Sequence, residues 1–238
     1  RAPPYFFFND PAPTEIYTFP YTPLFRSHSG GRRIWAFAEA PDGTVWAAGE
    51  NGLLRREAPA TPGGAARFTR YQEAEGLPTK RLRSLVLDAQ GWLWMGSTGG
   101  GLILRDPASG RFHVLKPGQG GFPHLQVRQV LLDPRGRGIW AATAGAGLVH
   151  VERLAGPAGA EPQFALQVYT TADGLPSDHL TALALDGQRR LWIASWGAGL
   201  SRLESLPEPG GPPPRFSPAL NAEQGLAGNQ IWSLQTDR

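Results

Sequence analysis

The sequence contains no cysteine, and this absence removes several classes of chemistry. Disulfide bonds, thiolate nucleophiles, iron–sulfur clusters and cysteine-bound zinc are excluded. The five histidines never show H-x-x-x-H spacing, so no metal site is expected. Neither a P-loop nor a G-x-S-x-G nucleophile motif occurs. We therefore expect a protein that is not an enzyme and has no cofactor. An enzyme such as a lyase or hydrolase stays open as an alternative, because a pair of catalytic carboxylates can be distant in the sequence and leave no local motif.

Long apolar runs and lysine are also scarce. No stretch approaches 18 consecutive apolar residues, so no segment is expected to span a membrane. Lys80 and Lys116 are the two lysines, and the net charge is only +3, which argues against nucleic acid as a partner. The chain begins with Arg1 rather than Met, so we expect it to be processed, excised or incomplete. A signal peptide or membrane anchor could have been removed in this way.

Glycine, proline and aromatic residues are abundant. The chain has 31 Gly, 23 Pro, 8 Trp, 11 Phe and 5 Tyr among 238 residues. This much apolar and aromatic surface can offset the entropy of ordering the chain, so a folded protein is predicted.

An internal repeat organises most of the sequence. Its four contexts are TVWAAGENGLLRR around Trp46, WLWMGSTGGGLILR around Trp94, GIWAATAGAGLVHV around Trp140 and RLWIASWGAGLSRL around Trp192. Short apolar runs precede them at 34–38, 82–87, 127–132 and 180–185, and a fifth run occupies 231–235. The segments EGLP (75–78), DGLP (173–176) and QGLA (224–227) stand before three of these runs. A fixed order of shared positions predicts a repeat architecture.

Each unit is predicted to contain four short strands. In the second unit these are 82–87, 92–96, 101–105 and 111–115, separated by Gly- and Asp-containing turns. A four-stranded meander repeated every 40–50 residues or so is typical of a β-propeller blade, whereas a β-sandwich, the alternative, does not repeat one motif. The expected fold is therefore an all-β propeller of four-stranded blades.

The blade count is expected to be four full repeats plus a partial fifth. Units begin near residues 34, 82, 127, 180 and 231, so the propeller domain is expected to cover 34–238. Propellers avoid exposed edges by closing their ring. We expect the N-terminal segment 1–33 to supply the closing strand, either through 5–8 or through 16–19, paired with 231–236. A fragment, or an edge covered by another subunit, is the alternative.

The repeated Trp, Gly and Asp positions are expected to be structural. The motif tryptophans should pack between blades. The Gly-rich turns at 99–101, 145–147 and 197–199 should use positive φ, since a strand rather than a helix follows each. The repeated Asp88, Asp133, Asp186 and Asp237 precede turns and should accept hydrogen bonds from them, with a calcium ring as the weaker alternative.

One end of the blades collects polar residues that do not repeat. In a meander, the connection before the first strand and the turn after the second lie on the same side, here called the connection face. The predicted ligand or partner residues on this face are Trp35, Lys80, Arg81, Arg83, His124, Arg128, His179, Trp196, Asn229 and Trp232. Trp and Arg together suit a carbohydrate, an anion or a protein side chain, and the alternative is a solvated rim.

The units resemble the two-component regulator propeller repeat, with its pattern v-x-s-l-x-x-D-x-x-G-x-l-W-i-g-T-x-x-G-G-L. Residues 82–102 match it almost position for position. Residues 180–200 match with Arg190 in place of a glycine, and 127–148 carry one extra residue before Trp140. The resemblance implies the extracytoplasmic sensor region of a bacterial signalling protein, such as a hybrid histidine kinase or diguanylate cyclase, which usually carries more blades.

Two functional hypotheses follow from the resemblance and the connection face. The first is a non-catalytic, ligand-sensing propeller in an extracytoplasmic (periplasmic) location, with a glycan as one candidate ligand. The second is an accessory propeller subunit that docks onto a larger, membrane-bound complex. Both hypotheses place the binding surface on the connection face.

Overall fold

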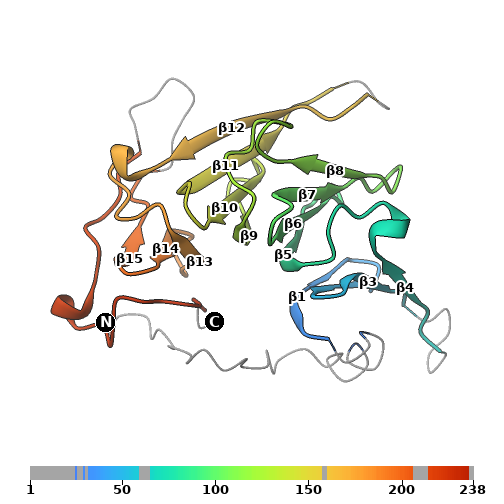
Figure 1. Ribbon diagram of the computed structural model, residues 1–238, viewed down its shortest axis with the longest axis horizontal. Helices are drawn as coiled ribbons and strands as arrows, with labels where there is room; N and C mark the ends of the chain where they lie inside the picture. The colour runs from blue at the N-terminus through green and yellow to red at the C-terminus, as the bar shows by residue number, and fades with distance from the viewer. Residues whose placement is uncertain are drawn as a thin grey trace. The chain divides into compact units, whose positions relative to one another are not determined.

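Short strands connected by tight turns make up nearly all of the described chain in the computed structural model of the protein (Figure 1). The structure describes residues 25, 29, 32–58, 65–156, 160–205 and 214–235. Within these ranges the elements are fifteen β-strands and three one-turn 3-10 segments, so the protein is all-β as predicted.

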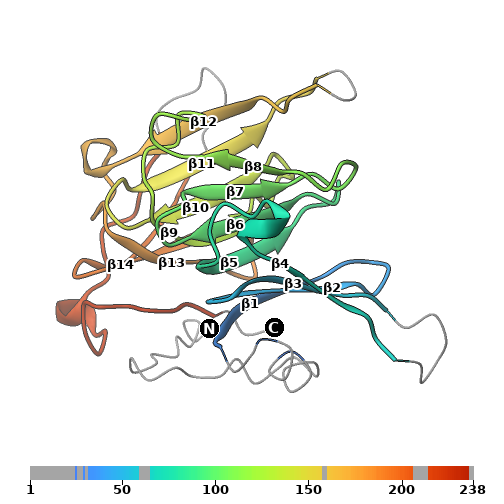
Figure 2. The ribbon, with the colours of Figure 1, turned by 45° about the vertical axis from the view of Figure 1, so that its right-hand side comes forward.

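Consecutive strands form four sheets, each a meander in which neighbours in sequence pair with one another. The first has β1 (Ile34–Glu39), β2 (Val45–Gly49), β3 (Gly52–Arg56) and β4 (Phe68–Tyr71). The second has β5 (Leu82–Leu87), β6 (Leu93–Ser97), β7 (Leu102–Arg105) and β8 (Phe112–Leu115), seen in order in Figure 2. The third has β9 (Val127–Leu132), β10 (Ile139–Thr143), β11 (Leu148–Arg153) and β12 (Phe164–Tyr169). The fourth has β13 (Leu180–Leu185), β14 (Leu191–Ser195) and β15 (Gly199–Arg202).

These sheets are the predicted blades. Four of the five predicted unit starts, at residues 34, 82, 127 and 180, are the first residues of β1, β5, β9 and β13. The predicted strands of the second unit agree with β5 to β8 to within one residue. The fourth sheet lacks a regular fourth strand in the described range, and isolated bridges of Leu200 with Leu220 and of Leu203 with Phe216 occupy that position.

The fifth predicted strand, 231–235, is not a strand in the structure. Ile231 is buried, and its carbonyl accepts a hydrogen bond from the Thr181 hydroxyl. The described range ends at Gln235, at the end of this run. The proposed closing segments 5–8 and 16–19 lie outside the described residues, so closure by the N-terminal segment stays a prediction.

Contacts divide the chain into two units, and one of them contains Glu15–Leu132. In this unit the first strands of successive blades are neighbours, β1 beside β5 and β5 beside β9. Trp46, Leu53, Leu82 and Met95 belong to one buried cluster formed by the first two sheets. Phe25 is fully buried against a second cluster and makes edge contacts with the rings of Phe37 and Phe68.

The other unit consists mainly of Asp133–Arg238 and contains β10 to β15. Here β10 lies beside β13. A buried cluster joins Ala182, Trp192 and Leu200 of the fourth sheet to Ile231, so this residue of the fifth apolar run is buried without belonging to a strand.

The repeated tryptophans are core residues, as predicted. Trp46, Trp94, Trp140 and Trp192 are all at most 8% exposed. The repeated aspartates also act as predicted in three repeats, because Asp88, Asp133 and Asp186 each accept backbone N–H groups of the turn that follows. Asp237 lies outside the described residues. In the repeats of Asp88 and Asp186 the turn bonds go to one carboxylate oxygen. Their second carboxylate oxygens accept from the indole N–H of Trp94 and Trp192, a contact that the sequence did not reveal.

The last glycine of each Gly-rich turn is required because a backbone carbonyl of a neighbouring segment lies close to its Cα. A Cβ at Gly101, Gly147 or Gly199 would lie 2.4, 2.1 or 2.0 Å from a carbonyl oxygen of Leu115, Tyr169 or Leu220. All three glycines also have positive φ, between 71° and 82°. No other residue fits these positions without moving a strand.

One detail of the predicted repeat register is wrong. The residue that takes the place of the turn glycine in the fourth repeat is Arg189, not Arg190. Arg189 has φ 60°, and its N–H donates to the Asp186 carbonyl, just as Gly91 donates to Asp88. The turn therefore keeps its geometry with a non-glycine residue in the left-handed region, at a modest cost.

The GLP segments are anchors for the connections between blades. In the first of them, Glu73–Glu75 form a 3-10 turn, and Gly76 ends the turn in the left-handed conformation. Leu77 then enters the core with 1% exposure. Gly174 and Leu175 repeat this arrangement in the next GLP segment. The anchor fixes the polar residues that follow it, and these form the connection face.

Candidate functional site

Backbone hydrogen bonds tie the connections between blades to the turns that follow the second strands. Gly52 donates to the carbonyl of Lys80 at 2.8 Å, and Thr98 donates to the carbonyl of Arg81 at 2.9 Å. In the other unit, Trp196 donates to the carbonyl of His179 at 2.8 Å. The meander thus brings the connection and the turn after the second strand together within each unit, as the sequence predicts.

A pocket of about 360 Å³ opens on the connection face of the unit Glu15–Leu132. It is lined by Arg32, Trp35, Glu50, Asn51, Lys80, Arg81, Leu82, Arg83 and Thr98. Four of the ten predicted site residues, Trp35, Lys80, Arg81 and Arg83, are in this lining. The volume is in the range of small-molecule sites, about 300–1,000 Å³.

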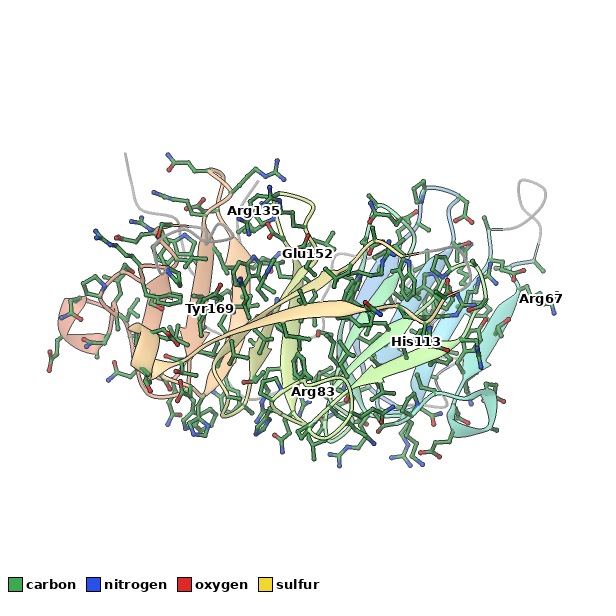
Figure 3. All side chains as sticks on the ribbon, turned by 90° about the horizontal axis from the view of Figure 1, so that it is seen from above. Arg67, Arg83, His113, Arg135, Glu152 and Tyr169 are labelled. Atoms are coloured by element: carbon green, nitrogen blue, oxygen red, sulfur yellow. The ribbon has the colours of Figure 1, made fainter. Side chains whose placement is uncertain are left out.

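Arg83 is the most firmly positioned cation of the pocket. Arg83, labelled in Figure 3, is the second residue of β5 and is half-buried in the burial pattern of that strand. Its guanidinium carbon lies 4.9 Å from the ring centroid of Trp35, and its Nε donates to the hydroxyl of Thr98 at 3.2 Å. The contact with the Trp35 ring and one hydrogen bond therefore hold the guanidinium in place and leave its two terminal nitrogens as donors.

Trp35 contacts two cationic side chains. The sequence predicts that it offers a stacking face to a ligand. In the structure, the guanidinium groups of Arg83 and Arg33 approach its ring at 4.9 and 5.8 Å. The ring is a platform for these cations, because the face of an indole attracts a guanidinium. We therefore assign Trp35 to positioning Arg83.

Like charges crowd this pocket. Burial lowers the pKa of Arg83, and the positive charges of Arg128 and Arg81 lower it further, while Glu50 acts in the opposite direction. Four of the lining residues are cationic and one, Glu50, is anionic. The pocket is therefore electropositive, a field that favours an anionic group.

Asn51 lines the pocket but is committed to structure. Its Nδ2 donates to the carbonyl of Ser29 at 3.2 Å, and its Oδ1 accepts from Nε2 of Gln72 at 2.6 Å. Sequence reasoning missed Thr98, which occupies a variable position of the repeat pattern, directly after the threonine position that Ser97 fills. It also missed Arg32, for which no signal exists, since the residue stands outside the repeat.

Two predicted residues of the same unit are not in the pocket lining. His124 accepts a hydrogen bond at Nδ1 from the N–H of Gln126 at 3.0 Å, so it stabilises its own connection. Arg128, the second residue of β9, is half-buried and acts on the pocket through its charge on Arg83.

The other four predicted residues belong to the unit Asp133–Arg238. Trp196 and Trp232 meet edge to face, with ring centroids 4.3 Å apart and an interplanar angle of 88°. Both are exposed, at 43% and 44%. Asn229 accepts from the N–H of Ala222 at 2.7 Å, and the backbone carbonyl of His179 accepts from Trp196. The second group is therefore an exposed aromatic pair on a hydrogen-bonded connection.

Among the described residues, no three His, Asp or Glu side chains are arranged to hold a metal ion. No helix in the described ranges has the length and apolarity needed to cross a membrane.

Known proteins match the chain in structure only. No family model matches it, and no curated protein sequence matches it. It is similar to the extracellular domain of the putative hybrid two component system BT3049 from B. thetaiotaomicron, with a TM-score of 0.66 and 20% identity over 87% of this chain and 25% of that one. The extracellular domain of BT4673 from the same organism gives 0.57 and 20%, over 84% and 24%.

A lyase shares the fold as well. The structure of a streptogramin B lyase is similar with a TM-score of 0.52 and 13% identity, over 78% of this chain and 54% of that one. The chain spans about a quarter of the two extracellular domains. The chain is thus a β-propeller module. Its fold is found both in signalling proteins and in an enzyme, so the fold alone assigns no activity.

Proposed function

We propose that the chain is a non-catalytic β-propeller module that binds a ligand at the pocket around Arg83, in the extracytoplasmic part of a signalling protein. The observation that carries this proposal is the fixed, half-buried guanidinium of Arg83 on Trp35. Crowding several cations around a half-buried arginine costs stability. Such a cluster is typical of a binding site, where a ligand compensates the charge.

The extracytoplasmic part of the proposal is supported by fold likeness and by the repeat pattern. Two of the similar structures are extracellular domains of two component systems. The same kind of protein is implied by the repeat pattern at residues 82–102.

A binding screen by NMR tests the proposal. The ¹⁵N-labelled chain is mixed in turn with saccharides, organic acids, amino acids and short peptides. We expect the resonances that shift to belong to the connection face, among them the indole N–H of Trp35. Shifts confined to the Asp-Gly turns, or chemical turnover of a probe, would contradict the proposal.

A second candidate function, docking onto a larger complex, is favoured by one observation. The edge-to-face pair of Trp196 and Trp232 is exposed, and aromatic residues are enriched in protein interfaces. Co-purification from the cells that encode the chain tests it, with Trp232→Ala compared with Leu154→Ala, a change at another exposed apolar residue of the same unit. Partner loss in both variants, or in neither, would exclude docking through the pair.

A further inference from the structure

The pocket around Arg83 offers both donors and one acceptor. Among the described residues, Nζ of Lys80 and the terminal nitrogens of Arg83 have no hydrogen-bond partner, whereas Nε of Arg83 is held by Thr98. Glu50 supplies a carboxylate in the same lining, and its charge acts favourably on Arg83. A ligand that satisfies all these groups must carry an anionic group and a hydrogen-bond donor.

We propose that this pocket binds a small hydroxylated organic acid, with its carboxylate on Arg83 and a hydroxyl on Glu50. This inference rests on the proposed function and names the ligand class of the same site. The planar fork of a guanidinium matches a carboxylate with two parallel hydrogen bonds. Lys80 and Arg81 add positive charge at the same pocket.

Glu50 distinguishes this class from inorganic anions. A fully ionised sulfate has only acceptor oxygens and two negative charges, so Glu50 would repel it and gain no hydrogen bond. A monoanionic acid with hydroxyl groups avoids the second charge and donates to Glu50. A neutral sugar would satisfy Glu50 but leave the cations uncompensated.

The side chain of Arg83 is prepared for such a ligand. Stacking on Trp35 and the bond to Thr98 already restrict its rotamers, so less conformational entropy is lost on binding. Because Nε is bonded to Thr98, the two terminal nitrogens of Arg83 are the donors that can bind a carboxylate.

Matched probe pairs provide the experiment. D-glucuronate is compared with D-glucose, D-gluconate with D-sorbitol, and sodium sulfate serves as the anion without a donor. The ¹⁵N resonances of the Arg83 Nε–H and the Trp35 indole N–H are followed during titration at constant ionic strength. We expect saturable shifts with the two acids, and binding about tenfold or more weaker for the neutral partners and for sulfate.

Variants of the same chain test whether the two parallel hydrogen bonds of the Arg83 guanidinium are needed. Arg83→Lys keeps the charge but loses the two parallel hydrogen bonds, so we expect about 10- to 100-fold weaker binding of the acids. Arg67→Ala is the charge control, because Arg67 is exposed, belongs to the same unit, and is well separated from Arg83 in Figure 3. It should change binding by less than about twofold, since exposed charges far from a site are screened. Glu50→Gln should remove the preference for the acids over sulfate, and thermal unfolding confirms that each variant is folded.

The outcomes separate the two proposals. Shifts on the connection face with neutral sugars or peptides but not with the acids would overturn this inference and leave the proposed function standing. Equal loss of binding in Arg67→Ala and Arg83→Lys would also overturn it, because the effect would be one of general charge. No shift on the connection face with any compound of the screen or the probe pairs would overturn both.

Discussion

His150 donates a hydrogen bond from its Nε2 to Oδ2 of Asp133 at 2.8 Å, in the place that an indole N–H takes in two other repeats. The third repeat has one extra residue between its aspartate and Trp140. The indole Nε1 of Trp140 is buried and has no hydrogen-bond partner within the described residues. His150 lies against the Trp140 ring, with centroids 4.5 Å apart, and satisfies the carboxylate instead.

The first prediction compares two tryptophans that differ in this hydrogen bond. Trp94→Phe removes a bond of 2.8 Å to Asp88, whereas Trp140→Phe removes none within the described residues. Both changes remove similar volume from a buried site. We expect Trp94→Phe to cost about 1–2 kcal/mol more in the free energy of unfolding, measured with urea. Equal losses would mean that the Asp88 contact contributes nothing.

The second prediction concerns the pH dependence set by Asp133. Burial alone would raise the pKa of this carboxyl, but hydrogen bonds from His150 and Arg135 outweigh burial and hold the pKa well below its ordinary value. A carboxyl whose pKa is lowered by folding stabilises the fold above its unfolded pKa, about 3.9, and this contribution is lost as the pH falls below that value.

Asp133→Asn tests that pH window. We expect the variant to be about 3 kcal/mol less stable than the natural chain near pH 7, because Arg135 and His150 lose a charged partner. The difference should shrink between about pH 4 and pH 2. Urea unfolding at several pH values measures it, and a difference that stays constant down to pH 2 would contradict the assignment.

The third prediction uses two glycines of one turn. Gly101 and Gly99 both have positive φ, at 76° and 93°. A Cβ at Gly101 would lie 2.4 Å from the Leu115 carbonyl oxygen, while a Cβ at Gly99 meets nothing within 4 Å. Gly99→Ala should therefore cost about 1 kcal/mol from backbone strain alone, and Gly101→Ala clearly more. Similar melting temperatures for the two variants would show that the close contact relaxes freely.

The fourth prediction tests the contribution of the segment before β1. Phe25 is fully buried, with its ring centroid 5.4 Å from those of Phe37 and Phe68. Phe25→Ala should cost about 3–5 kcal/mol, because a large cavity would remain in that cluster. Hydrogen exchange should show the loss of protection in β1 and β2 first. Unchanged exchange there would mean that the cluster does not depend on Phe25.

The repeat made the blades predictable. Short apolar runs, positive-φ glycines and turn aspartates are local signals, and they located β1, β5, β9 and β13 to the residue. Where prediction failed, the deciding contact was not local. The run 231–235 has the apolar pattern of a first strand, but the structure makes it irregular, with Ile231 and Leu234 packed in a buried cluster with residues of the fourth sheet.

The candidate site also has features that the sequence predicts and features that it does not. The connection face could be inferred because a meander places fixed parts of each repeat on one side, and Lys80, Arg81 and Arg83 do line one pocket. That Trp35 contacts Arg83 could not be inferred, because the contact depends on where two neighbouring blades place their second residues. The choice of His150 over Trp140 as the partner of Asp133 likewise depends on side-chain directions across paired strands.

The sequence by itself determined the all-β class, the blade boundaries and the structural roles of the repeated Trp, Gly and Asp, since each follows from spacing within one repeat. Only the tertiary structure decided which polar residues meet. Thr98 and Arg83 are fifteen positions apart, and Trp35 belongs to another blade than either of them. Their contacts come from packing one blade against the next, and packing joins residues whose separation in the sequence carries no signal.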